Sequence, residues 1–217
     1  MSEAVKRSYN SARRDEQARA TRRAIVGAAA RLFVGRGYGA TTIDAIAEDA
    51  GVSRKTVFTS VGGKSEALKL AIDWAIVGDD EPVALLDRPR IQASMAEPDA
   101  RRILREFAHD VRLIGARIAP LVAVAVAAAG TDQEITALVE EGRSQRLEGM
   151  HRLAQVLADR RALRTDLSVL EVADVLWLFN DPAVYQQLVL QQGWDPDRYE
   201  NWLADTLIRL ILKSPDS

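Results

Sequence analysis

Four consecutive polar residues, Ser53-Arg54-Lys55-Thr56, carry the chemistry that is easiest to name in this sequence. Arginine and lysine side chains donate hydrogen bonds to O6 and N7 of guanine, and a threonine can hydrogen-bond a base or contact the methyl group of thymine. On the first turn of a helix, such a set could read the edges of base pairs in a major groove.

Two short helices joined by a glycine turn are predicted within residues 42–59. Thr42 and Ser53 are good N-caps for the two helices, and Gly51 separates them. This order is typical of a helix-turn-helix, whose second helix lies in the major groove. On spacing alone, a simple corner between two helices with charges at its surface fits equally well.

Longer amphipathic helices are predicted on both sides of this motif. The preceding helix ends in the glycine-rich stretch 35–39, and the following one starts at Lys64 or Ser65. Their apolar residues recur at helical spacing: Ile25, Ala28, Ala29, Leu32 and Phe33 before the motif, and Ala67, Leu68, Ala71, Ile72 and Ala75 after it. Val52, Val57 and Phe58 are predicted to anchor the second short helix.

The string from Leu32 to Ser53, LFVGRGYGATTIDAIAEDAGVS, closely resembles the N-terminal signature of the TetR family of bacterial regulators. The match continues through residues 54–58 and 64–68, and the strong resemblance covers roughly residues 20–70. It implies an all-α protein of about nine helices. Residues 1–64 would form an N-terminal arm and a three-helix DNA-binding domain, and residues 65–217 a larger ligand-binding and dimerisation domain.

The resemblance also implies roles for single residues. Thr42 would offer its hydroxyl and backbone N–H to a phosphate, Ser53 would cap the recognition helix, and Lys64 would contact a phosphate. The predicted DNA-binding residues are Thr42, Ser53, Arg54, Lys55, Thr56, Phe58, Thr59, Ser60 and Lys64.

Three positions depart from the family pattern. Phe58 stands where the family usually has tyrosine, which puts one phosphate contact in doubt. Thr59 and Ser60 stand where histidine or an aromatic residue is frequent. Lys55 replaces a residue that is often small, so the operator sequence cannot be inferred.

The charge distribution agrees with a DNA-binding N-terminal part. Residues 1–69 carry 13 basic and seven acidic residues, a formal charge of +6, so the remainder carries −8 of the overall −2. A basic module joined to an acidic domain is expected when only the module meets DNA. Residues 1–14 are predicted to be a flexible arm, and Arg13, Arg14 and Arg19 could track the DNA or be disordered.

The C-terminal part is predicted to be helical throughout. After an irregular connection over 78–98, with room for one short helix, helices are predicted at about 99–118, 120–129, 133–160, 168–191 and 196–213. The fourth is expected to bend or break at Asn180-Asp181-Pro182, because proline removes a helix hydrogen bond. The apolar run Ile118–Ala129 is too short to span a bilayer and is predicted to be buried.

A homodimer and a ligand pocket are predicted within this C-terminal part. A dimer would place two recognition helices about one DNA turn apart, on a palindromic operator. The candidate interface residues on the last two long helices are Val172, Val175, Leu188, Trp202, Leu207, Leu210 and Ile211. The candidate pocket residues are Trp74, Phe107, His109, Arg112, Met150, Trp177, Phe179, Asn180 and Tyr185. Taken singly, each of these pocket candidates fits an ordinary core or hydrogen-bonded residue better than a ligand contact. Arg112, if buried, would need a charge partner such as an anionic ligand.

The sequence contains few features that would support another class of function. There is no cysteine and there are only two histidines, so neither a metal site nor a cofactor is predicted. No phosphate-binding loop, nucleophile elbow or zinc-protease motif occurs, so an enzyme is not expected. The leading hypothesis is a cytoplasmic repressor released from its operator by a small molecule. The alternatives are an enzyme, and an architectural or adaptor protein that uses the helix-turn-helix without sequence specificity.

Overall fold

The computed structural model describes residues 3–214, with side chains from Arg13 onward. The all-α fold is confirmed, with ten α-helices in the described residues where about nine were predicted. They are α1 (Glu3–Ala40), α2 (Ile43–Asp49), α3 (Arg54–Ser60), α4 (Lys64–Val77), α5 (Pro89–Ala96), α6 (Ala100–Ala129), α7 (Gln133–Asp159), α8 (Val169–Phe179), α9 (Pro182–Tyr185) and α10 (Pro196–Ile211). A 3₁₀ turn, η1 (Leu85–Asp87), and a π-helical turn, η2 (Gln186–Gln191), complete the set.

Local sequence signals define most of the helix ends. Ser168 and Glu171 form a reciprocal capping box at the start of α8: the Ser168 Oγ accepts from the Glu171 N–H at 3.2 Å, and the Glu171 carboxylate accepts from the Ser168 N–H at 2.8 Å. Gly37, at φ 81°, interrupts the helical backbone near the end of α1. This conformation suits glycine because an L side chain would be strained there.

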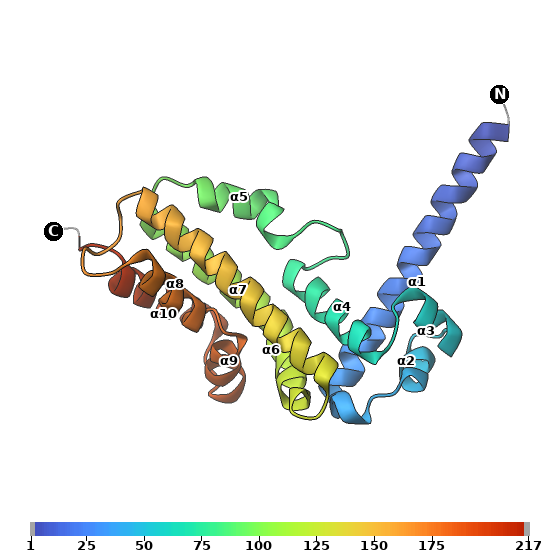
Figure 1. Ribbon diagram of the computed structural model, residues 1–217. Coiled ribbons are helices and arrows are strands. Elements are labelled where there is room, and N and C mark those ends of the chain that lie inside the picture. Colours follow the sequence, from blue (N-terminus) through green and yellow to red (C-terminus); the bar gives the residue numbers. More distant parts are fainter. Residues whose placement is uncertain (1–2, 215–217) are drawn as a thin grey trace.

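The prediction of a flexible arm over residues 1–14 is wrong for most of its length. The structure is helical from Glu3 onward, while Met1 and Ser2 lie outside the described residues. The segment from Glu3 to Val26 contains neither glycine nor proline and is rich in alanine and arginine, which favour helix. The segment predicted as an arm is therefore part of α1, and the N-terminal half of α1 projects away from the rest of the molecule (Figure 1).

The predicted helices 99–118 and 120–129 are a single helix, α6, which continues through Pro120. Proline costs about 3 kcal/mol in a helix interior, but Ile118, Ala119 and Leu121 beside it are all buried. Their packing holds the helix together across the lost hydrogen bond. Among the described residues α6 is also the one helix long and apolar enough to cross a membrane. Here it lies at the centre of the protein, in contact with α1, α4, α7 and α10.

Two apolar cores organise the chain into a head, α1–α4, and a body, α5–α10. The head core joins the predicted stripe of α1 to Ile46, Val57 and Leu68, and it takes in Leu121 and Ala125 from α6. The body core lies between α6, α7, α8 and α10. Since α6 contributes to both cores, it ties the head to the body (Figure 1).

Candidate nucleic-acid interface

The two short helices of the motif are capped as their sequence predicts. The Thr42 Oγ1 accepts from the Ala45 N–H at 3.1 Å, and the Ser53 Oγ accepts from the Thr56 N–H at 3.1 Å. Each cap satisfies one of the backbone donors left free at a helix start. Gly51, at φ 66°, makes the turn between the helices. The helix-turn-helix is therefore built by local chemistry.

The third helix has one buried side and one exposed side. Val57 is fully buried in the head core, whereas Arg54, Lys55 and Thr59 are exposed. Phe58 does not anchor the core as the sequence analysis expected, because its side chain lies outside and remains 47% exposed. Phe58 thus adds an aromatic ring to the exposed side of α3 that carries Arg54 and Lys55.

Arg54 and Lys55 differ in their intramolecular partners. The Arg54 guanidinium donates to Asp44 of α2 at 2.7 Å, and its carbon lies 5.6 Å from the centre of the Phe58 ring. Among the described residues Lys55 has no ion-pair partner. Lys55 is therefore ready to bind an anion or a base edge, while Arg54 must first exchange Asp44 for a new acceptor.

The hydroxyl groups near α3 are largely engaged within the helix. The Thr56 Oγ1 lies 2.8 Å from the Ser53 Oγ, and the Thr59 Oγ1 donates to the Lys55 carbonyl at 3.1 Å. Ser60, at the last turn of α3, is half-buried. Thr56 and Thr59 can still accept a hydrogen bond through their second lone pair.

Lys64 is held against the end of α1. Its Nζ donates to the Tyr38 carbonyl at 3.1 Å and lies 4.0 Å from the centre of the Tyr38 ring. Burial, followed by the nearby charge of Asp132, raises the pKa of the Tyr38 hydroxyl above its ordinary value. Lys64 thus has a fixed position at the start of α4, and any phosphate contact would have to use its remaining donors.

Of the three arginines considered for the arm, Arg13 and Arg14 are exposed on the projecting part of α1. Arg19 lies further along and pairs with Asp80, in the turn after α4. Asp80 also pairs with Arg23. This contact could not be predicted from the sequence, because the run of acidic residues at 79–81 does not indicate which basic residues it meets.

The candidate pocket residues do not surround one large cavity. Asn180 and Tyr185 line a small cavity of about 10 Å³ between α6 and α9, room for about one water molecule. Met150 contacts Asn180 next to it, at 3.7 Å between Sδ and Nδ2. Trp74 is partly buried against the head core, and Phe107 is partly buried against the body core. An open hollow of about 420 Å³ near Arg164 and Lys213 involves none of the predicted residues.

Arg112 and His109 share a carboxylate of the protein itself. Both side chains, on α6, contact Glu200 of α10, with 3.1 Å between the His109 Nδ1 and the carboxylate. Although burial opposes it, the hydrogen bonds from Arg112 and His109 lower the pKa of Glu200. Since Arg112 already has this partner, its charge does not call for an anionic ligand.

Aromatic residues cluster around the C-terminal helices of the body. Phe179 packs on Trp202, with 6.0 Å between ring centres, while Trp177 donates from Nε1 to the Arg143 carbonyl at 3.3 Å and lies under Arg146. Tyr199, which the sequence analysis did not single out, is fully buried against Tyr185. Its hydroxyl has no hydrogen-bond partner among the described residues.

The candidate interface residues fall into two groups. Val172, Leu207 and Ile211 are fully buried within the body core of the single chain, so their side chains are not available at its surface. Val175, Leu188, Trp202 and Leu210 are partly or largely exposed on α8, η2 and α10. Leu170, Leu178 and Leu190, at 63%, 58% and 52% exposure, add to this apolar surface.

Comparison with curated protein sequences finds no match. A family model for bacterial regulatory proteins of the tetR family matches residues 25–68, which span most of the head. Solved structures match over almost the whole chain. One described as a TetR-family transcriptional regulator from Syntrophomonas wolfei has a TM-score of 0.67 at 18% identity, covering 88% of this chain and 94% of that one.

Two further structures give the same picture. NalD of Pseudomonas aeruginosa, the secondary repressor of the MexAB-OprM multidrug efflux pump, has a TM-score of 0.67 at 17% identity, covering 89% of this chain and 98% of that one. A transcriptional regulator from Saccharomonospora viridis, solved in complex with choline, has a TM-score of 0.65 at 20% identity, with coverages of 89% and 98%.

The fold and the head define a class of protein: an all-helical protein with an N-terminal helix-turn-helix and a larger helical body. Within that class, residues 25–68 match the model of the tetR family of bacterial regulatory proteins, and the solved structures named above share the fold of the whole chain. The resemblance found in the sequence is thereby confirmed.

Proposed function

We propose that this protein is a homodimeric transcriptional repressor that binds a palindromic operator through α3 and is released by a small organic ligand. The observation that carries the proposal is the exposed side of α3. Lys55 and Phe58 face solvent there while Val57 secures the helix in the head core. A helix fixed on one side and basic on the other is suited to a major groove.

The proposed DNA contacts are the nine residues predicted from the sequence, with Lys55 as the leading base-reading side chain. Within the part of the chain that the structure describes, Lys55 has no ion-pair partner to give up, whereas Arg54 must leave Asp44. Asp44 would in turn lie near DNA phosphates once Arg54 moved. We therefore expect Arg54 to contribute less to affinity than its charge suggests.

Selection of bound duplexes from random DNA tests this proposal. The expected result is a palindromic consensus bound about 10³-fold or more tightly than random duplex at 150 mM salt. Weak binding to every duplex, with a steep salt dependence and no consensus, would contradict it and would favour an architectural protein.

The proposed dimer uses the apolar surface of α8 and α10. Val175, Trp202 and Leu210 are its centre, with Leu170 and Leu178 beside them. Exposed apolar residues on adjacent helices commonly mark a contact with another chain. The residues buried in the core, Val172, Leu207 and Ile211, would support the interface from behind.

The proposed ligand site lies beside the small cavity at Asn180 and Tyr185. The unpartnered Tyr199 hydroxyl, packed behind Tyr185, is a polar group that a ligand could satisfy. The choline complex of the regulator from Saccharomonospora viridis supports a small-molecule site in a body of this fold. With a cavity of only about 10 Å³, binding has to be accompanied by movement of α6, α9 or both.

Thermal-shift screening of small organic molecules tests the ligand part of the proposal. A true effector raises the melting temperature of the wild type, lowers its affinity for the selected duplex, and loses both effects when Tyr185 is replaced by Trp. A compound that weakens DNA binding equally in the Tyr185→Trp protein would place the site elsewhere.

A further inference from the structure

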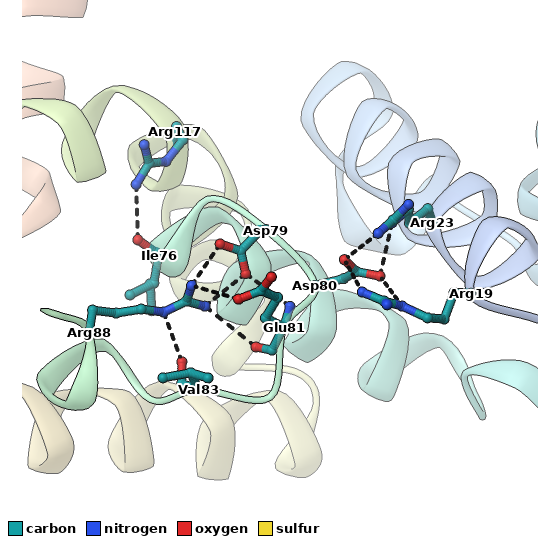
Figure 2. Close-up of polar contacts among 9 residues, drawn as sticks. All are labelled: Arg19, Arg23, Ile76, Asp79, Asp80, Glu81, Val83, Arg88 and Arg117. Atoms are coloured by element: carbon teal, nitrogen blue, oxygen red, sulfur yellow. Dashed lines mark hydrogen bonds and ion pairs between the residues drawn. The ribbon is translucent and has the colours of Figure 1, made fainter. Parts of the chain in front are cut away.

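Asp80 connects the turn after α4 to α1 of the head. Its carboxylate accepts two hydrogen bonds from Arg23, at 2.9 and 2.8 Å, and two longer ones from Arg19, at 3.4 and 3.3 Å (Figure 2). Arg19 and Arg23 are one helical turn apart, so a single carboxylate spans one turn of α1. Its side chain is only 9% exposed, although both arginines are half exposed.

The same turn is fixed to the body from the other side. Arg117 of α6 donates to the carbonyls of Ala75 and Ile76, at 2.6 and 2.9 Å, where α4 ends. Gly78, at φ 91°, then turns the chain directly beside the Arg117 guanidinium. Two residues later Asp80 reaches α1, so residues 75–80 form a polar connection from α6 to α1.

A second ion pair in this turn serves a different segment. Arg88 donates to both carboxylate oxygens of Asp79, at 2.8 and 2.7 Å, and to the Val83 carbonyl (Figure 2). These contacts close the loop between α4 and α5 and do not involve the head. Neighbouring aspartates with the same bidentate geometry therefore hold different elements.

We propose that Asp80 is a positioning residue for DNA recognition: by binding Arg19 and Arg23 it sets the angle between α1 and α6, and so the spacing of the two α3 helices in the dimer. The apolar head core lies along α1 beyond Arg23 and does not replace this contact. Without the Asp80 pair, the directional contact that remains between α1 and α4 is the hydrogen bond from Lys64 to the Tyr38 carbonyl, at the opposite end of α4, and the rest is non-directional packing. The effect on DNA rests on the proposed function, while the effect on the angle does not.

The angle is measured directly by spin labels. The chain has no cysteine, so Glu48→Cys on α2 and Gln155→Cys on α7, both exposed, give unique labels in head and body. Mixing the doubly labelled chain with an excess of unlabelled chain isolates the distance within one chain, whether the protein is a monomer or a dimer, and pulsed electron resonance measures it. The variants are Asp80→Asn and its matched control Asp79→Asn, with Asp80→Glu as a conservative rescue.

The expected result is a distance distribution that broadens or shifts in Asp80→Asn, stays as in the wild type in Asp79→Asn, and is largely restored in Asp80→Glu. Distributions that are identical in wild type and Asp80→Asn would overturn the proposal. So would equal changes in both asparagine variants, because a general loosening of the turn would then be the cause. Circular dichroism confirms that each variant is folded.

Binding to duplexes with altered half-site spacing provides the second measurement. Duplexes selected by the wild type are lengthened or shortened by one base pair between the half-sites. Asp80→Asn should bind the original duplex about tenfold more weakly, in keeping with the loss of a charge-assisted contact, and should discriminate less between spacings. If Asp80→Asn changed the angle between head and body but kept the wild-type preference for half-site spacing, the proposed role of Asp80 in DNA recognition would be wrong. If the angle changed but the wild-type protein selected no DNA sequence, only the proposed function would be refuted.

Discussion

Gly115 lies where α6 passes Tyr185, and it offers a sharp test of the packing in the body. A Cβ added at this position would lie 3.0 Å from the Tyr185 Cγ and 3.1 Å from its Cβ and Cδ2. Tyr185 is buried and its ring meets Tyr199 edge-on, at 5.2 Å between ring centres. The ring therefore has little freedom to move away from a new methyl group.

The expected magnitude follows from two opposing effects. Alanine is about 1 kcal/mol better than glycine inside a helix, whereas overpacking a closed core costs about 1–3 kcal/mol. For Gly115→Ala we expect a net loss of about 1 kcal/mol in the free energy of unfolding. The matched control is Gly142→Ala on α7, where the added methyl group meets nothing within 4 Å. The control should gain up to about 1 kcal/mol, because only the helix preference changes.

Thermal unfolding at one fixed protein concentration separates the two variants. At this chain length 1 kcal/mol corresponds to about 2–4 °C, so the two alanine variants should melt about 4–8 °C apart, on opposite sides of the wild type. If Gly115→Ala were as stable as Gly142→Ala, the close approach of α6 to Tyr185 would not exist in solution.

Three further predictions concern the DNA-binding surface, the turn and the dimer. Lys55→Ala should lower discrimination between selected and mutated duplexes by about 1–3 kcal/mol, measured by competition gel shift. The control Lys69→Ala removes the same charge from a side chain paired with Glu141, and it should leave the discrimination unchanged. The hydrogen bonds from Arg23, together with Arg19, hold the pKa of Asp80 at about 2. The contribution of the Asp80 ion pairs to the free energy of unfolding should therefore be complete above about pH 4 and be lost as the pH falls towards 2. The melting temperatures of wild type and Asp80→Asn should converge only below pH 4. Leu210→Glu should produce monomers in analytical ultracentrifugation, and a dimer that persists would exclude α10 from the interface.

The parts of the fold that depend on neighbouring residues could be predicted from the sequence. The caps at Thr42, Ser53 and Ser168 each act within three residues, so their geometry is local. The break at residues 180–182 is likewise a consequence of Pro182, which starts α9. The continuation of α6 through Pro120 could not be foreseen, since it depends on packing with helices far away in the chain.

The candidate sites show the same division between local and distant contacts. The helix-turn-helix was recognisable because its residues are consecutive, but the outward direction of Phe58 depends on how α3 packs in the head. Asp80 meets Arg23 across 57 residues, and Glu200 meets Arg112 across 88. Ion pairs between residues so far apart in the chain produce no periodic pattern in the sequence. The partner of an acidic residue in a loop cannot be predicted when the chain contains many arginines.

The tight packing between α6 and α9 has a kinetic consequence. If the proposed ligand site is correct, a molecule larger than water can bind beside Tyr185 only after α6 and α9 have moved apart, since the cavity measures about 10 Å³. If one molecule in about a hundred is open, the apparent affinity is about a hundredfold weaker than the intrinsic affinity. When closure is fast compared with ligand capture, association remains proportional to ligand concentration but is slowed by the same factor. At high concentration the rate reaches a ceiling set by how often the protein opens, and substitutions that loosen the contact at Gly115 would raise that ceiling.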